Sequence, residues 1–153
     1  MKKLLSLFIC LSALFMYSCS SDDDDNDGKE LPNNLINYTI KYQDDQYDEH
    51  ADKGTKIYIF SGLTLSDVKE YKGAGVVVLQ DDKTKSYTKT VTTGNDGKAT
   101  ITGLEVSQNY IQYIESAGLS GLIYRSAFIT EASAKTYTRD HVFKYDDYLN
   151  LNK

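Results

Sequence analysis

The chain has 153 residues, 41% of them hydrophobic and 25% charged, and a formal net charge of −5 at pH 7. This length is enough for one domain with a sizeable core. The acidic balance argues against nucleic acid as a partner, because binding to phosphates requires a basic surface.

The first 18 residues have the composition of an export signal. Lys2 and Lys3 precede an apolar run over residues 4–17, which has the length of a signal-peptide core and is shorter than the roughly 20 residues of a membrane-spanning helix. Ser18 and Cys19 close this run, and a small residue directly before a cysteine resembles the lipobox of bacterial lipoproteins. The resemblance implies cleavage after Ser18 and acylation of Cys19, for example with palmitate. The alternative is an ordinary secretory signal with an incidental cysteine.

An acidic run follows the cysteine. After Ser21 the chain continues with Asp22, Asp23, Asp24 and Asp25, an arrangement that resembles the surface-export signal of Bacteroidetes lipoproteins. The resemblance implies a protein that is lipid-anchored in the outer membrane and faces the cell exterior. A solvated acidic spacer is the alternative, as it is for most runs of charge.

Composition divides the chain into three parts. Residues 1–18 are the predicted signal peptide. Residues 19–34 are rich in Asp, Asn and Ser and contain the only proline, so they are predicted to be a linker with little to bury. Residues 35–153 are predicted to form the folded domain. If Cys10 leaves with the signal and Cys19 is acylated, this domain has no disulfide.

The folded part has the pattern of β-strands, with short runs of Val, Ile, Tyr, Thr and Phe between polar turns. We predict strands over residues 35–43, 55–61, 74–80, 85–93, 98–102, 109–115, 122–130 and 137–145. Within the third of these, the run from Val76 to Leu79 suits a strand buried on both faces or one near a sheet centre, with Val77 and Leu79 on the same face. A helical turn is predicted over residues 65–72.

Asp96 and Gly97 lie in the turn between the predicted strands 85–93 and 98–102. An Asp-Gly pair favours a β-hairpin, because glycine adopts positive φ freely. We therefore predict a hairpin here, with Asn tolerated better than Val at position 97. Ile101 and Leu104 are predicted to face the core, with Gly103 permitting a tight bend between them.

One stretch carries a family resemblance. It begins with the residues from Gly73 to Leu79 and a polar hairpin, continues through the Asp-Gly turn to a short strand ending in Gly103-Leu104, and reaches Tyr110 in the next strand. This order resembles the prealbumin-like and Cna-B-like sandwich domains. The resemblance implies an all-β fold, an antiparallel Greek-key β-sandwich of prealbumin-like or immunoglobulin-like type with about eight strands. Such a fold hosts many functions.

Motifs for catalysis or metal binding are missing from the sequence. His50 and His141 have no second histidine at metal-ligand spacing, and Ser120 lies in a predicted hairpin turn rather than a Gly-x-Ser-x-Gly elbow. We therefore predict no catalytic residue, no metal ligand and no cofactor, and a protein that is not an enzyme. A small hydrolase stays as a third alternative, because the separation of a carboxylate pair depends on the fold.

Two further features bear on binding. The loop over residues 44–52 holds five acids, which leaves open a calcium site or a solvated acidic loop. The chain has 13 tyrosines and no tryptophan, so exposed tyrosines could form a contact face for a glycan or a protein. The expected function is a membrane-anchored, non-catalytic binding or adhesion module. The alternative is a structural spacer or assembly component of a cell-surface complex, and an exposed aromatic patch would favour the first.

Overall fold

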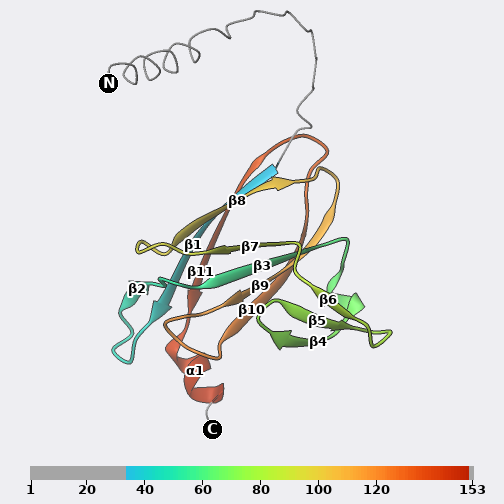
Figure 1. Cartoon of the computed structure of the whole chain (residues 1–153). Coiled ribbons are helices and arrows are strands. Elements are labelled where there is room, and N and C mark those ends of the chain that lie inside the picture. The colour runs from blue at the N-terminus through green and yellow to red at the C-terminus, as the bar shows by residue number, and fades with distance from the viewer. Residues whose placement is uncertain (1–33, 152–153) are drawn as a thin grey trace, which may run out of the picture.

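The computed structural model describes residues 34–151 (Figure 1). The described part contains eleven strands, one 3-10 turn and one short helix. The strands are β1 (Asn34–Gln43), β2 (Glu49–Ala51), β3 (Lys56–Ser61), β4 (Val68–Gly73), β5 (Val76–Leu79), β6 (Thr84–Ser86), β7 (Lys89–Thr92), β8 (Lys98–Leu104), β9 (Asn109–Glu115), β10 (Ile123–Ile129) and β11 (Thr136–Phe143), while η1 spans Leu65–Asp67 and α1 spans Tyr145–Leu151.

All eight predicted strands are present, and the differences lie in short or polar segments. The segment 85–93 is divided into β6 and β7. β2 and β4 were missed because both are rich in charged or polar residues and show little apolar alternation. The helical turn predicted over residues 65–72 is only the 3-10 turn η1, which Thr64 caps, and its second half is strand β4.

The strands form three sheets. In the first, which we call the β1 sheet, β1 pairs with β11 along one edge and with β2 and β8 along the other. The central sheet has the order β10-β9-β3-β7, and the small sheet has the order β4-β5-β6. Neighbours that are not consecutive in the chain, such as β9 beside β3 and β8 beside β1, are typical of Greek-key sandwiches. The predicted all-β sandwich is therefore confirmed.

One strand pair departs from the antiparallel arrangement. β1 and β11 pair in parallel, from Leu35 opposite Thr136 to Tyr42 opposite Phe143. Only antiparallel strands can be joined by a tight turn. Because β1 and β11 lie at opposite ends of the described chain, no turn restricts their relative direction.

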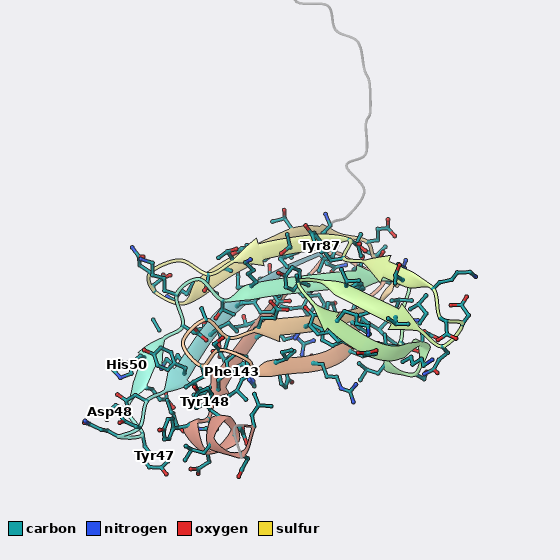
Figure 2. All side chains as sticks on the ribbon, turned by 60° about the horizontal axis from the view of Figure 1, so that its bottom comes forward. Tyr47, Asp48, His50, Tyr87, Phe143 and Tyr148 are labelled. Carbon is teal, nitrogen blue, oxygen red and sulfur yellow. The ribbon has the colours of Figure 1, made fainter. Side chains whose placement is uncertain are left out.

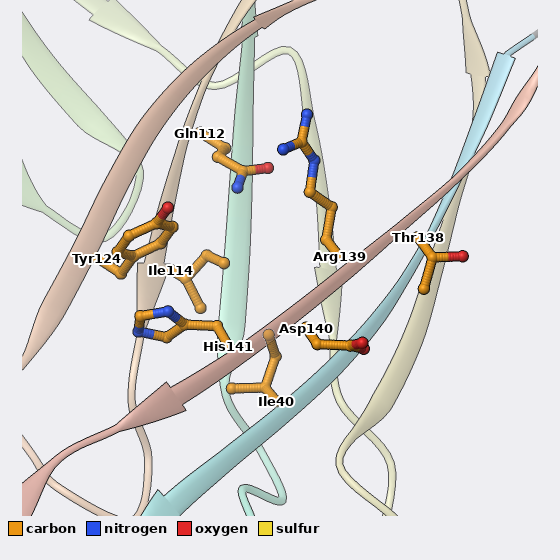
Figure 3. Close-up of a pocket in the computed structure, with 8 residues that line it drawn as sticks. All are labelled: Ile40, Gln112, Ile114, Tyr124, Thr138, Arg139, Asp140 and His141. Carbon is orange, nitrogen blue, oxygen red and sulfur yellow. The ribbon is translucent and has the colours of Figure 1, made fainter.

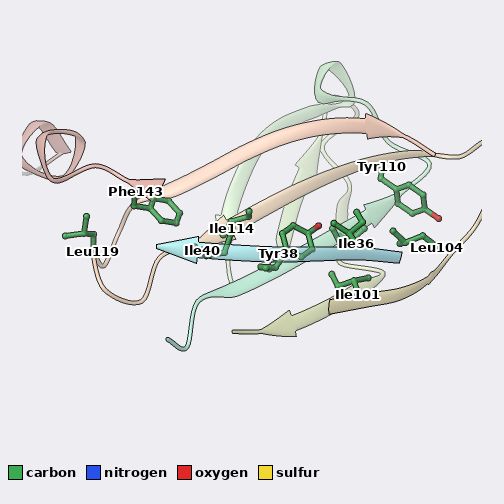
Figure 4. Packing of buried hydrophobic residues seen from close by; sticks show 11 residues of the cluster. Ile36, Tyr38, Ile40, Ile101, Leu104, Tyr110, Ile114, Leu119 and Phe143 are labelled. Carbon is green, nitrogen blue, oxygen red and sulfur yellow. The ribbon is translucent and has the colours of Figure 1, made fainter. Parts of the chain in front are cut away.

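The main core lies between the β1 sheet and the central sheet (Figure 4). Ile101 and Leu104 face it as predicted, and Gly103 between them has a φ of +68°. Each buried side chain of this size contributes about 1.5–3 kcal/mol relative to exposure. The buried members are Ile36, Tyr38, Ile40, Ile57, Ile59, Ile101, Leu104, Tyr110, Ile114, Leu119 and Phe143.

A second core lies between the other face of the central sheet and the small sheet. Its buried members are Tyr58, Phe60, Leu63, Val68, Val77, Ile111 and Tyr113, with Tyr71 and Leu79 packed against them. Val77 and Leu79 therefore share a face, as predicted. β5 is the middle strand of the small sheet, whereas the strands buried on both faces are β3 and β9, because each contributes to both cores.

The turn between β7 and β8 is not the predicted hairpin. β7 pairs with β3 in the central sheet and β8 pairs with β1, so the chain crosses here from one sheet to the other. Gly97 does have a positive φ of +71°. Glycine is also required here for a second reason: a Cβ at this position would collide with the carbonyl oxygen of Ile40.

The last described element, α1, lies against the main core. Tyr145 and Tyr148 of α1 pack against that core, and the side chain of Leu151 lies near Gly121 in the turn between β9 and β10. Within residues 34–151, no helix combines the length and apolar character needed to cross a membrane.

Candidate functional site

The residues predicted to direct anchoring and export lie outside the described residues. These are the acylation site Cys19 and the export signal formed by Ser21, Asp22, Asp23, Asp24 and Asp25. Their roles stay predictions, and the candidate site lies on the folded domain.

The carboxylates of the acidic loop after β1 do not converge on one point. Asp44 accepts hydrogen bonds from the backbone nitrogens of Gln46 and Asp48 at 2.9 and 3.0 Å, and its Oδ2 lies 2.8 Å from Nε2 of His50. The contact with His50 lowers the pKa of the Asp44 carboxyl. Asp52, at the end of the loop, is fully buried. In the described part of the chain, no three His, Cys, Asp or Glu side chains are grouped to hold a metal ion.

Asp52 joins three turns at one end of the sandwich. Its carboxylate accepts hydrogen bonds from the Ser116 hydroxyl at 2.6 Å and from the Gly118 backbone nitrogen at 2.8 Å. Its carbonyl accepts from the Thr93 hydroxyl. The Ser116 hydroxyl also accepts from the Leu119 backbone nitrogen at 2.9 Å. The Ser116–Asp52 pair is therefore engaged in holding turns together, which is a structural role.

The exposed tyrosines do not form one platform. Tyr47 lies between β1 and β2, Tyr87 between β6 and β7, and Tyr124 in β10. Figure 2 shows Tyr47 and Tyr87 in widely separated parts of the molecule. The Tyr47 hydroxyl donates to Asp146 at 3.0 Å, and Tyr87 packs against the Tyr58 ring at 5.3 Å between centroids. Among the described residues, a single tyrosine-built contact face is therefore not present.

A polar hollow opens between the edge strands β10 and β11, where the two sheets of the main sandwich are not joined (Figure 3). Its volume is about 200 Å³, below the roughly 300–1,000 Å³ of pockets that enclose drug-sized ligands. The residues that line it are Ile40, Gln112, Ile114, Tyr124, Thr138, Arg139, Asp140 and His141.

Two polar side chains reach the interior at this hollow. Gln112 is 1% exposed, and its Oε1 accepts a hydrogen bond from the Tyr38 hydroxyl at 2.8 Å. Burial raises the pKa of Tyr38, so its hydroxyl remains a donor. The guanidinium carbon of Arg139 lies 5.2 Å from the centre of the Phe128 ring, a cation–π contact worth about 0.5–2 kcal/mol. Its Nε is buried without a hydrogen-bond partner among the described residues.

His141 is part of an aromatic stack at the mouth of the same hollow. Its ring lies 4.0 Å from Tyr124 in a stacked arrangement and 4.5 Å from Phe143 edge-on. Burial lowers the pKa of His141, the Asp147 carboxylate opposes this shift, and the Lys144 ammonium adds to it. The ring is therefore uncharged at neutral pH, and its contacts are those of a packing residue.

The edges of the two larger sheets differ in what they expose. β10, at one edge of the central sheet, exposes Ile123 (47%), Tyr124 (37%) and Ile129 (69%). β7, at the opposite edge, has four residues and exposes no large hydrophobic side chain. In the β1 sheet, the exposed residues of β11 (Thr136, Thr138 and Asp140) and of β8 (Lys98, Thr100 and Thr102) are polar, and the three-residue β2 exposes Glu49, His50 and Ala51. A long edge strand with exposed apolar residues is a template for pairing with another chain.

A second hollow lies at the Ile129 end of β10. Its volume is about 280 Å³, and it is lined by Leu63, Thr64, Asn109, Tyr110, Ala127, Phe128 and Ile129. β10 therefore has a largely apolar hollow at its Ile129 end and the polar hollow at its other end, beside Tyr124. We take β10 and these two hollows as the candidate functional site.

Comparison with known proteins gives structural similarities only. No family model matches the sequence, and no curated protein matches it. The similar solved structures include GBS52, the minor pilin of Streptococcus agalactiae (16% identity, TM-score 0.38), a streptococcal ancillary pilin (16%, 0.35) and a mutant of the major pilin of Streptococcus pyogenes (14%, 0.36). The matches cover 74%, 74% and 73% of this chain but 45%, 33% and 49% of those chains, so the chain spans less than half of their length. These scores are too low to assign a function.

The sequence predicts β10 as a strand but not as an edge strand. Whether a strand is central or lateral depends on its neighbours, which no local pattern encodes. Gln112 did leave a signal, because it is the single polar residue within the otherwise apolar run from Tyr110 to Ile114. Arg139 left none, since an arginine in an alternating strand ordinarily faces solvent.

Proposed function

We propose that this chain is a non-catalytic interaction module that is anchored to a membrane at Cys19 and contacts a protein partner through the outer edge of β10. The observation that carries the proposal is the exposure of Ile123, Tyr124 and Ile129 along one edge strand. An extended segment of a partner gains backbone hydrogen bonds from such an edge and specificity from adjacent side-chain pockets. A protein suits this site better than a glycan, because the exposed tyrosines lie apart.

Other features support a non-catalytic role. The polar hollow is small. Of the groups that could perform acid–base chemistry, His50 contacts Asp44, the Ser116 hydroxyl is bonded to Asp52, and His141 is stacked between aromatic rings. Each is used in a local contact, which favours binding over catalysis as the function of the domain.

The sequence supports the anchoring part of the proposal. The apolar run before Ser18-Cys19 and the aspartates at 22–25 resemble lipoprotein signals, and an anchor in the outer leaflet of the outer membrane would place the domain at the cell exterior. Several acyl chains on one cysteine hold a protein stably, since each buried CH₂ contributes about 0.8 kcal/mol. We expect Cys19→Ala to move the protein out of the detergent phase in phase partitioning. Unchanged partitioning would contradict lipidation at this residue.

Replacing the four aspartates at 22–25 with alanine tests the display of the domain on the cell surface separately. The accessibility of the domain to protease on intact cells should then fall.

The contact itself is tested by site-specific photocrosslinking in cells that make the full chain. A photoreactive phenylalanine analogue replaces Ile123 or Ile129 in β10, and the matched control carries it at Thr90, which is exposed on β7 at the opposite edge of the same sheet. Discrete protein adducts are expected from positions 123 and 129 and not from position 90. Equal labelling at all three positions, or none, would favour the structural-spacer alternative.

A further inference from the structure

The outer edge of β10 has a regular set of unpaired backbone groups. Next to β10, the Ser116 nitrogen donates to the Leu122 carbonyl, and the Thr130 nitrogen donates to the Gln108 carbonyl. Hydrogen-bonded and non-hydrogen-bonded pairs alternate along an antiparallel ladder, so the even-numbered residues of β10 direct their backbone groups to β9. The backbone groups that point outward, with no partner among the described residues, belong to Ile123, Arg125, Ala127 and Ile129.

The side chains of β10 are arranged symmetrically about its middle residue, Ser126. In an antiparallel pair of two β10 strands related by a two-fold axis at Ser126, Ile123 lies opposite Ile129 and Tyr124 opposite Phe128. Arg125 then lies opposite Ala127 rather than opposite the like charge of its own copy. Opposed apolar pairs stabilise an antiparallel ladder and opposed like charges destabilise it.

This register also agrees with the backbone. The hydrogen-bonded pairs would be 123 with 129 and 125 with 127, which are the residues whose backbone groups point outward. Ser126 would lie on the axis as a non-hydrogen-bonded pair. Its buried hydroxyl has no partner among the described residues, and in this arrangement it lies beside the same hydroxyl of the second copy.

We propose that the partner of β10 is a second copy of this chain, joined by two-fold antiparallel pairing centred on Ser126. The inference rests on the proposed function of β10 as a contact edge and names the partner. Pairing joins two four-stranded central sheets into one continuous sheet and covers both exposed edges, as expected of a symmetric interface that uses the same patch twice. Residues 20–33 are poorer candidates for this edge, since they contain no β-branched or aromatic residue.

The register predicts a specific disulfide. Residues directly opposite in a non-hydrogen-bonded pair have Cα atoms roughly 4.5 Å apart, within the range that a disulfide spans. We expect Ser126→Cys to form a covalent dimer under mild oxidation in membranes containing the full chain. The wild type, with its native cysteines, and Asn95→Cys in the distant β7–β8 turn are the controls and should not form it.

Charge changes at Ala127 test the register independently of cysteine chemistry. Ala127→Glu places two carboxylates opposite the two Arg125 side chains, whereas Ala127→Lys places two ammonium groups there. From cross-strand pair energies, we expect a dimer dissociation constant about two- to thirtyfold lower for Ala127→Glu and higher by a similar factor for Ala127→Lys. The double variant Arg125→Glu/Ala127→Lys should restore dimerisation. Sedimentation of the purified full-length protein in detergent measures each, and circular dichroism verifies folding.

The outcomes separate this inference from the proposed function. Photocrosslinked adducts from position 129 with twice the mass of the chain, together with the Ser126→Cys dimer and opposite effects of the two Ala127 variants, support the second copy. Adducts of another mass, with no disulfide dimer and no charge effect, would overturn self-pairing and leave β10 as a contact edge for a different protein. Absence of adducts from β10 would overturn both.

Discussion

Gly97 offers the sharpest test of the fold, because two independent constraints meet there. Its φ is +71°, and a Cβ would overlap the carbonyl oxygen of Ile40 and lie 3.2 Å from the backbone nitrogen of Asp52. These neighbours are backbone atoms, so they cannot move aside as a flexible side chain would. The sequence predicts that Asn is tolerated better than Val at position 97, and the structure adds that Asn is also destabilising: it satisfies the backbone angle but brings the same Cβ.

The magnitude follows from the structure. An L-residue in the left-handed region costs about 1–2 kcal/mol. Displacing Ile40 disturbs two hydrogen bonds, from the Ile40 nitrogen to the Gly97 carbonyl at 2.8 Å and from the Asp52 nitrogen to the Ile40 carbonyl at 2.9 Å, each contributing about 0.5–1.5 kcal/mol. We expect Gly97→Ala to lower the free energy of unfolding by about 2–5 kcal/mol, from a total of about 5–15 kcal/mol.

Gly62 is the matched control. Its φ is +68°, but nothing lies within 4 Å of a Cβ built there, so Gly62→Ala carries only the conformational cost and Gly62→Asn should recover much of it. Urea unfolding of the chain lacking residues 1–19, with unchanged m-values, measures all four variants. A Gly97→Asn variant as stable as the wild type, or equal losses of free energy for Gly97→Ala and Gly62→Ala, would show that the Cβ contact with the Ile40 carbonyl is not decisive.

Three further changes probe the interior. Tyr38→Phe leaves the buried Oε1 of Gln112 without its donor and should cost about 1–3 kcal/mol in urea unfolding; no loss would mean that this bond is not made. Asp52→Ala removes the acceptor of the Ser116 hydroxyl and should cost about 2–4 kcal/mol, with a smaller loss for Asp52→Asn, which keeps one acceptor. Burial lowers the pKa of His141 from 6.5, so the unfolded chain binds more protons below that pH. The stability should therefore be full above about pH 6.5 and fall as the pH drops toward the folded pKa. A His141→Phe variant should lose this pH dependence, and an unchanged dependence would assign it to another group.

Local chemistry was sufficient to predict most of the elements. The runs around Ile57, Val77 and Ile111 are apolar and β-branched or aromatic, so their strand conformation follows from side-chain shape and burial. The positive φ of Gly97 follows from the properties of glycine itself. The bend at Gly103 between buried Ile101 and Leu104 was also readable, because it depends on residues adjacent in the chain.

Where those elements lie depends on contacts between distant residues. The residues from Thr93 to Lys98 have the sequence of a hairpin, yet β7 and β8 belong to different sheets, because β7 pairs with β3 and β8 pairs with β1. The order of the central sheet likewise leaves β10 at an edge, with Ile123 and Ile129 exposed. A strand's sequence specifies which face is apolar, but only the arrangement of all strands decides whether a neighbour covers that face and its backbone edge. For this protein, the conformation of each strand was encoded locally, whereas the candidate site arises from the pairing that the tertiary structure leaves unfilled.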